Sequence, residues 1–359
     1  TYYLASASIP GVYDQLVQDP NGNWVSKQTG ERFGAQSVPG SSGEGYNVVQ
    51  VGHVDPQVAQ VSSRHYLLDS TTKTCTIGFT GGVVGHAGCV ADYWIHPDVL
   101  KTVAEVNRDG VSILRMPYPL NGRVYQAIRF QTDNAQGYHA YVYDLATGLM
   151  IYEGSRTQGA NVLTPPIGGP GQAGVGAGST MLTTGWIVQA KHVEVPWKDQ
   201  AALPWVAQIQ QLTYQGSLTT VMQAAPPLHL PMTVTITPNA RGLHWLRYTA
   251  ASTVQSLYGM PPQQDQRVDT CGAATLGGLW LPPQAMRALQ QGQVLDRNDV
   301  VHTTLTVTQV GGGTVTITEM GPRHRTDWMY DASSGVLTAM STSQQVGMAT
   351  MTRRVQLAR

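Results

Sequence analysis

Charged residues are scarce in this chain of 359 residues. They make up 12% of the sequence, and the 22 Lys and Arg are balanced by 22 Asp and Glu. No basic run occurs, and lysine is confined to Lys27, Lys73, Lys101, Lys191 and Lys198. Phosphate binding needs a concentration of positive charge, so we expect neither nucleic acid nor an anionic membrane surface as a partner.

Long apolar runs are also missing, because Gly, Pro or a charged residue interrupts every hydrophobic stretch. A bilayer-spanning helix needs about 20 apolar residues, so no transmembrane segment is expected. The sequence begins at Thr1 without a hydrophobic leader. That start is typical of a mature exported protein, although a shortened chain would look the same. We therefore expect a secreted, periplasmic or cell-surface location.

Cysteine occurs three times, at Cys75, Cys89 and Cys271. The first two bracket a glycine-rich segment, 76–88, that could fold back as a hairpin and let them form a disulfide in an oxidising compartment. Cys271 would then remain single. The alternative is three reduced, buried thiols that behave as small hydrophobic groups.

Two segments of the chain resemble one another in a way that indicates an internal duplication. Residues 92–100, around Trp94, parallel residues 278–286, around Trp280. A Tyr-Asp-x-x-Thr/Ser-Gly element begins at Tyr143 and again at Tyr330, after almost the same interval. Each is predicted to form a tight turn, here called an Asp-Gly turn, in which Asp bonds the following backbone and Gly supplies a positive φ. Similarity at a constant offset is the mark of repeated units. The sequence therefore predicts two diverged copies of one fold.

The local pattern is that of β-strands. Alternating β-branched runs occur at 111–116, 124–131 and 233–237, and a hairpin is predicted from 301–308 and 314–318 across Gly311, Gly312 and Gly313. Helices are predicted only at 97–106 and 283–290, each beginning at a proline. The predicted fold class is mainly β, with two tandem antiparallel sheet or sandwich units that each carry one short helix.

Domain boundaries follow from the duplication and from composition. Residues 1–45 are predicted to form an extended N-terminal arm, and the two β-rich repeat domains to span 46–197 and 198–359. A Gly- and Pro-rich insert at 161–180 occurs in the first copy alone, as either an interaction element or a passive loop. The arm could add a strand to a neighbouring subunit.

The strongest catalytic candidate is Cys271. The string Asp-Thr-Cys-Gly-Ala-Ala at 269–274, preceded by glutamines, resembles the nucleophile motif of papain-like bacteriocin-processing peptidases over about ten residues. That resemblance implies a thiolate activated by a helix N-terminus and a histidine, for which His302 and His324 are the downstream candidates. Gly278 and Pro282 interrupt the helix that should follow, and a buried or bonded cysteine is the simpler interpretation.

A candidate metal site combines His86, Cys89, Asp92 and His96. Imidazole and thiolate together suit zinc or copper, but the spacing matches no strong metal motif. Isolated histidines are the simpler interpretation, and we expect no cofactor.

Aromatic residues offer a possible ligand-stacking surface. Trp94 and Trp280 recur at equivalent places, which favours a role as core anchors over ligand stacking. Tyr138, Tyr141 and Tyr143 lie on one predicted strand, where sheet packing explains them as well as a binding stripe does.

The function predicted from these patterns is non-enzymatic. We expect an exported β-rich structural or binding protein of a cell envelope, extracellular matrix or surface assembly, whose partner is a second copy of itself or another envelope protein. The alternatives are a cysteine-dependent hydrolase using Cys271 and a metal-binding protein using the region from His86 through Cys89 to His96.

Overall fold

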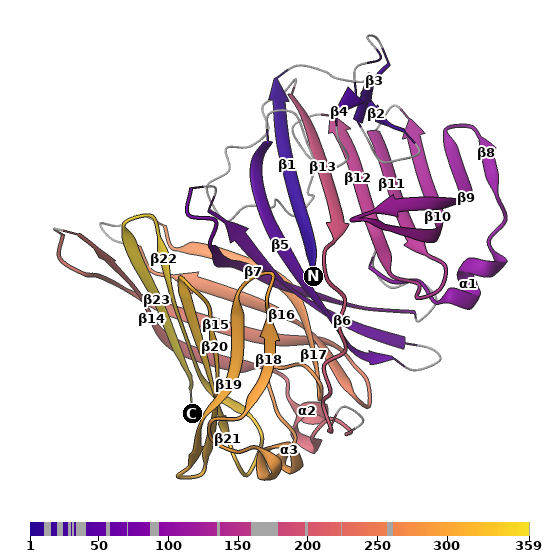
Figure 1. Cartoon of the computed structure of the whole chain (residues 1–359). Helices are drawn as coiled ribbons and strands as arrows, with labels where there is room; N and C mark the ends of the chain where they lie inside the picture. The colour runs from indigo at the N-terminus through magenta and orange to yellow at the C-terminus, as the bar shows by residue number, and fades with distance from the viewer. Residues whose placement is uncertain are drawn as a thin grey trace. The chain divides into compact units, whose positions relative to one another are not determined.

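The chain folds into two large antiparallel sheets and one small one, as seen in a computed structural model (Figure 1). The structure describes residues 1–10, 16–19, 24–27, 30, 32–33, 41–54, 58–69, 71–86, 93–134, 137–158, 179–197, 200–223, 225–256 and 261–358. The predicted fold class is confirmed, because β-strands dominate and two similar halves follow one another.

Sheet 1 is ten-stranded and has the order β7-β6-β5-β1-β13-β12-β11-β10-β9-β8. Its strands are β1 Tyr2–Pro10, β5 Ser41–Val54, β6 Val58–Leu68, β7 Cys75–His86, β8 Val106–Arg108, β9 Val111–Leu120, β10 Arg123–Asn134, β11 Gly137–Asp144, β12 Met150–Gln158 and β13 Ser179–Ile187. The small sheet consists of β2 Leu16–Gln18, β3 Trp24–Ser26 and β4 Arg32–Phe33.

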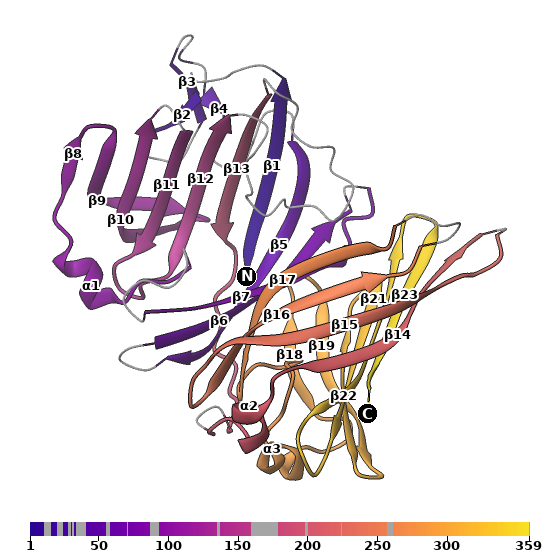
Figure 2. The ribbon, with the colours of Figure 1, turned by 180° about the vertical axis from the view of Figure 1, so that it is seen from behind.

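Sheet 2 is also ten-stranded and has the order β17-β16-β15-β14-β23-β22-β21-β20-β19-β18 (Figure 2). Its strands are β14 Leu212–Met222, β15 Leu228–Arg241, β16 Trp245–Val254, β17 Gln263–Gly272, β18 Val294–Asn298, β19 Thr303–Gly311, β20 Thr314–Met320, β21 His324–Asp331, β22 Leu337–Val346 and β23 Ala349–Leu357. The helices are α1 Pro97–Thr102, α2 Pro204–Gln208 and α3 Pro283–Ala288.

The two large sheets have the same topology. When the ten strands of each are numbered in chain order, both sheets read 4-3-2-1-10-9-8-7-6-5. In both copies the first strand pairs with the last, β1 with β13 and β14 with β23. An isolated bridge also joins Trp94 to Leu149 and Trp280 to Val336, at matching places. The duplication predicted from the sequence is therefore a duplication of the fold.

The predicted helices exist but are shorter than expected. α1 and α3 begin at Pro97 and Pro283, and they end at Thr102 and Ala288 because Val103 and Leu289 are already extended. α2 was not predicted, since its five residues are too few to show a helical period. It begins at Pro204, near the start of the predicted second copy.

Each predicted Asp-Gly turn is formed as expected. The Asp144 carboxylate accepts hydrogen bonds from the backbone and hydroxyl of Thr147, and the Asp331 carboxylate accepts from Ser333 and Ser334. The serine hydroxyls and amides lower the pKa of Asp331 to about 2. Gly148 and its equivalent Gly335 have φ of 73° and 74°, a conformation that glycine adopts without steric cost.

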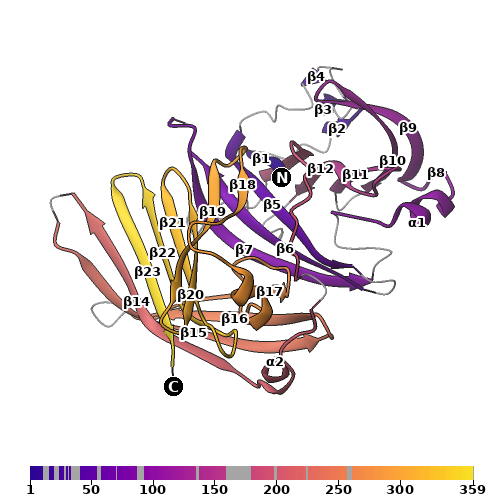
Figure 3. The same ribbon diagram turned by 60° about the horizontal axis from the view of Figure 1, so that its bottom comes forward.

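Contacts divide the chain into two compact units. Unit 1 comprises 1–49, 65–71 and 86–190, and unit 2 comprises 50–64, 72–85 and 191–359. The domain boundaries at 46–197 and 198–359 stay a prediction. The division by contacts differs from them, because it groups the segments 50–64 and 72–85 of the first copy with unit 2. Among the described residues unit 2 has the larger core, with Trp280, Leu281 and Tyr330 completely buried. Tyr330 belongs to β21, one of the strands of sheet 2 labelled in Figure 3.

The first residues of the predicted arm lie inside sheet 1. β1 pairs with β5 on one side and with β13 on the other, so both of its edges are occupied within the chain. Donation of β1 to a neighbouring subunit would require it to leave these two ladders. Of the predicted insert at 161–180, residues 161–178 lie outside the described part of the chain.

The Asp-Gly turn of the second copy can be tested by Gly335→Ala. A Cβ on Gly335 would lie 2.2 Å from the carbonyl oxygen of Leu281, whereas a Cβ on Gly313, at φ 75°, would meet nothing within 4 Å. We expect Gly313→Ala to lower the free energy of unfolding by about 1 kcal/mol and Gly335→Ala by about 3 kcal/mol. Urea unfolding followed by circular dichroism measures both. Equal losses would show that the turn is not packed against Leu281.

Candidate functional site

The cysteines do not have the surroundings of nucleophiles. Cys271 is 1% exposed and its sulfur accepts a hydrogen bond from the backbone of Leu279. Burial raises the pKa of the Cys271 thiol well above its ordinary value and that of Cys75 to about 11. Cys75 is a free thiol and Cys89 lies outside the described residues, so the disulfide between them stays a prediction.

The two histidines proposed to assist Cys271 lie in different surroundings. His302 is exposed in a turn with φ 53°, and His324 is 4% exposed at the start of β21. The interactions of Cys271 in the described chain involve neither of them. A thiol held neutral and apart from a base argues against cysteine catalysis.

The predicted metal cluster is only partly within the described residues. Cys89 and Asp92 lie outside them, and of His86 only the backbone at the end of β7 is described. His96 is exposed at the N-terminus of α1, where its Nδ1 accepts a hydrogen bond from the Asp98 backbone at 3.2 Å. Among the described residues no group of three potential ligands is placed to hold a metal ion.

The aromatic candidates are mainly core residues. Trp280 and Tyr138 are fully buried, Tyr143 is 4% exposed and Tyr141 is half-buried. Trp94 is half-buried, and its indole nitrogen donates to the carbonyl oxygen of Thr147 at 2.9 Å. Trp280 is thus a core residue, as the sequence predicted, whereas Trp94 is half-buried and contacts the turn at Thr147.

Unit 2 contains a buried ionic cluster that the sequence did not predict. Glu319 accepts from the Arg64 guanidinium on one carboxylate oxygen, and Nε2 of His324 lies 3.2 Å from the other. The Arg64 guanidinium also lies over the ring of Trp328, 4.9 Å from its centroid. In this cluster a buried carboxylate balances a partly buried guanidinium.

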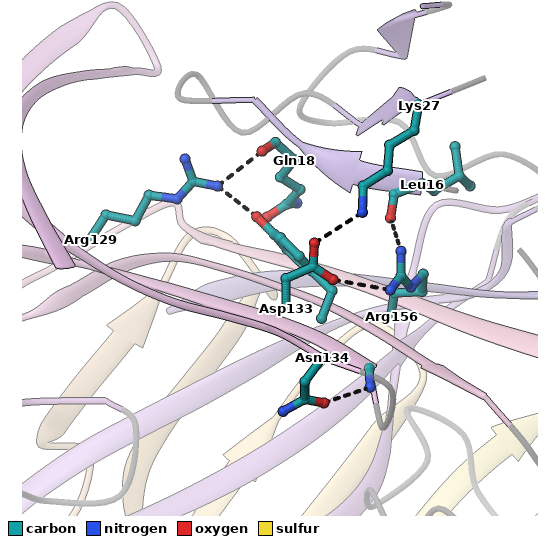
Figure 4. Close-up of polar contacts among 9 residues, drawn as sticks. Leu16, Gln18, Lys27, Arg129, Asp133, Asn134 and Arg156 are labelled. Carbon is teal, nitrogen blue, oxygen red and sulfur yellow. Dashed lines mark hydrogen bonds and ion pairs between the residues drawn. The ribbon is translucent and has the colours of Figure 1, made fainter. Parts of the chain in front are cut away.

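Unit 1 contains a second cluster, in which a buried guanidinium donates to neutral oxygen atoms (Figure 4). Arg129, on β10, is 7% exposed, and one of its nitrogens donates to the carbonyl oxygen of Gln18 at 3.1 Å and to the hydroxyl of Tyr138 at 2.6 Å. Neither acceptor is charged. Within the described chain, Arg129 forms no ion pair with a carboxylate.

A second arginine lies beside the first. Arg156, on β12, is 3% exposed and donates to the carbonyl oxygen of Leu16 at 2.6 Å. It also lies 3.4 Å from the carboxylate of Asp133, which pairs with the half-exposed Lys27 at 3.1 Å. Two cationic groups, Arg156 and Lys27, thus pair with the Asp133 carboxylate. We call Arg129, Arg156, Asp133, Lys27 and Tyr138 the arginine cluster.

The strand registers place both arginines on one face of sheet 1, which we call the arginine face. Arg129 is opposite Val142, and Val142 is opposite Tyr152. Tyr138 is opposite Arg156 and lies four residues before Val142, on the same side of β11. Gln18 of the small sheet donates to the Tyr152 hydroxyl, so β2 lies against this face.

Hydroxyl groups complete the arginine face. Tyr118 is 1% exposed and its hydroxyl has no hydrogen-bond partner among the described residues. Burial raises the pKa of Tyr138 to about 12 and those of Tyr118 and Tyr152 further. The three phenols therefore stay protonated and can serve as neutral hydrogen-bond donors.

The arginine cluster is specific to the first copy. In the first copy Ala127 lies opposite Asp144, and in the second copy Thr314 lies opposite Asp331. Since the two aspartates are equivalent, Ala127 corresponds to Thr314. Counting along the two ladders, Thr316 occupies the place of Arg129, and the same registers place Ser343 where the first copy has Arg156. The shared scaffold does not require these arginines.

A local signal for the cluster existed in the sequence. In the predicted strand 124–131, Tyr125 and Ala127 share one face with Arg129, whereas Ile128 and Phe130 share the other. Apolar side chains on both faces indicate a strand that is buried on both sides, and such burial would include the arginine.

Comparison with known proteins adds no functional relative. No family model matches the chain, and no curated protein matches it. A solved structure of a DUF3598-family protein of unknown function from Nostoc punctiforme PCC 73102 aligns over 99% of this chain and 95% of its own, with 6% identity and a TM-score of 0.17. A likeness at that TM-score supports no conclusion about this chain.

The burial of the cysteines predicts slow thiol chemistry. We expect native protein at pH 8 to leave Cys75 and Cys271 unlabelled by iodoacetamide, because their raised pKa values keep both thiols neutral. The labelling rate of Cys75 should continue to rise with pH until about pH 11. Peptide mass spectrometry, with unfolded protein as the fully labelled reference, measures each site. Rapid labelling of native Cys271 would restore it as a candidate nucleophile.

The ionic cluster of unit 2 predicts a strong effect of Glu319→Gln. That substitution leaves the partly buried guanidinium of Arg64 without its partner carboxylate, so we expect the free energy of unfolding to fall by about 2 kcal/mol. Asp327→Asn is the matched control, because its partner Arg325 is half exposed, and its cost should stay below about 1 kcal/mol. Equal losses in urea unfolding would mean that burial does not strengthen the Arg64–Glu319 pair.

Proposed function

We propose that the chain is a non-enzymatic binding protein whose first copy holds an organic anion on the arginine face of sheet 1. The observation that carries this proposal is the burial of Arg129 with neutral oxygen atoms as its hydrogen-bond acceptors. A buried guanidinium without a carboxylate costs several kcal/mol of stability. Such a cost is typical of a group kept for binding.

The residues around Arg129 suit an anion with an apolar body. Tyr118, Tyr138 and Tyr152 contribute rings as well as hydroxyl groups, and the ring of Trp24 lies 5.9 Å from that of Tyr138. These rings belong to the buried core of unit 1, and the apolar body of an organic anion would contact them while its charge meets the guanidinium. Guanidinium bound to carboxylate or sulfonate, with aromatic rings around it, is a common mode of organic-anion recognition.

Catalysis has less support than binding. A nucleophile needs an activating base within hydrogen-bond reach, and the thiol of Cys271 is neutral and buried. The phenols of the arginine face are likewise held protonated by burial. These groups can orient a ligand but cannot accept its protons at neutral pH.

Assembly through strand exchange is less favoured. β1, the strand of the predicted arm, is held between β5 and β13. No described helix is long and apolar enough to cross a membrane. Export, an envelope location and a protein partner stay predictions from composition.

The proposal is tested with 8-anilinonaphthalene-1-sulfonate, an aromatic anion that fluoresces when bound in an apolar site. We expect Arg129→Gln to weaken its binding roughly tenfold or more, because a charge-assisted hydrogen bond is lost. Arg123→Gln, on the same strand but exposed, is the control and should bind as the natural protein does. N-phenyl-1-naphthylamine, the uncharged analogue, should bind weakly to all three proteins.

Circular dichroism must show the same fold in each variant. Equal affinity of the natural protein and Arg129→Gln for the anionic dye would refute anion binding at the arginine face. Equal affinity for the charged and uncharged dyes would refute it as well, since the guanidinium would then play no part.

A further inference from the structure

We infer that one end of sheet 2 is a membrane-contact site, which inserts apolar side chains into the interfacial region of a phospholipid bilayer. The site consists of Val221 and Met222 at the end of β14, and of Val346 and Met348 at the turn between β22 and β23. We call these four residues the apolar tip, and all four lie in the described part of the chain. The apolar tip belongs to unit 2 and the arginine face to unit 1, so the two can be tested separately.

Strand pairing brings the two halves of the apolar tip together. β14 pairs with β23, with Val221 opposite Thr350 and Met222 opposite Ala349. Ala349 is in turn opposite Val346 across the β22–β23 turn. The ends of the β14–β15 and β22–β23 hairpins therefore lie side by side, and both project from sheet 2 (Figures 1 and 3).

The apolar tip is exposed on both sides of the sheet. Val221 and Met222 are 44% and 50% exposed, Val346 is 47% and Met348 is 84% exposed. Consecutive residues of a strand point to opposite faces, so neither face of β14 is covered at its end. Between the two hairpin ends lies a hollow of about 390 Å³ that no charged side chain lines. Apolar side chains that gather in one exposed place are typical of an interaction surface.

The size of the apolar tip favours a bilayer over a protein partner. A stable protein interface takes about 20–30 residues from each side, whereas the tip offers four apolar side chains at the ends of two hairpins. A second copy of the chain would bury little surface on so narrow a contact. A bilayer needs no complementary surface, because each apolar side chain that enters it gains transfer free energy by itself.

The charges near the apolar tip suit phospholipid headgroups. Asp and Glu are absent from both hairpins, in residues 212–241 and 337–357. Arg323 lies beside the tip, with its guanidinium 3.5 Å from the carbonyl oxygen of Gly347. A headgroup phosphate at this place would meet an arginine and no carboxylate of the two hairpins. Binding by insertion of apolar side chains does not need the polybasic run that the sequence lacks.

Co-sedimentation with phosphatidylcholine vesicles tests the apolar tip. We expect the natural protein to bind and Met348→Gln to weaken binding roughly tenfold, because a polar side chain gains nothing from entering the bilayer. Leu243→Gln is the matched control and should bind as the natural protein does. Leu243 is 69% exposed, but it lies at the β15–β16 turn, at the opposite end of sheet 2.

Vesicles that also contain phosphatidylserine test the arginine. One arginine near an anionic surface should raise the affinity roughly fivefold over phosphatidylcholine alone. Arg323→Gln should abolish this gain and leave the binding to phosphatidylcholine unchanged. A gain that persists in Arg323→Gln would contradict the placement of a headgroup phosphate beside this residue.

A spectroscopic measurement shows which residues enter the lipid. With methyl-labelled methionine and a nitroxide-labelled lipid in nanodiscs, we expect the methyl signals of Met222 and Met348 to broaden. The signals of Met232 and Met286, which are 2% and 4% exposed in the core of unit 2, are the internal control and should stay sharp.

The outcomes decide between a bilayer and other partners. Binding by the natural protein and Leu243→Gln, its loss in Met348→Gln and selective broadening of Met222 and Met348 would support the membrane-contact site. Absence of binding to both kinds of vesicle would overturn it, as would binding that Met348→Gln leaves intact. A dimer seen by light scattering without lipid and lost in Met348→Gln, together with no vesicle binding, would overturn it in favour of a second copy of the chain.

Discussion

Pairing between the first and the last strand of each copy is the interaction on which the rest of the structure depends. β1 pairs with β13 from Tyr2 opposite Ile187 to Pro10 opposite Ser179, and β14 pairs with β23 in the same way. Such pairing closes a loop of well over a hundred residues, and its entropic cost is recovered only when the intervening ladders form. Each copy should therefore form its sheet as one cooperative unit.

That pairing also explains the position of the small sheet. β2–β4 lie in the chain between β1 and β5, which are neighbours in sheet 1. An insertion between two adjacent central strands stays attached to the sheet at both of its ends. The side chain of Trp24 then reaches Thr184 of β13, the other neighbour of β1. In this way a short segment with little structure of its own is held over the arginine face.

The sequence revealed what depends on local chemistry. Trp94 and Trp280, the prolines that begin α1 and α3, and the Asp-Gly turns were all predicted, because turn residues and caps act within a few positions. Arg129 and Arg156 were missed, because their burial depends on ladders and on a covering segment far away in sequence. The metal hypothesis stays a prediction, because Cys89 and Asp92 lie outside the described residues, and the interactions of Cys271 involve neither His302 nor His324.

The two units accommodate partly or fully buried charge in two ways. In unit 2 the guanidinium of Arg64 meets the carboxylate of Glu319, and the pair can stabilise the fold without any ligand. In unit 1 the guanidinium of Arg129 meets a carbonyl and a phenol, which satisfy its hydrogen bonds but not its charge. The second copy has Thr316 at that place and forms the same sheet, so folding does not explain the arginine. Within the described part of the chain Arg129 is buried without a carboxylate partner, and the anionic ligand that we propose would supply the missing negative charge.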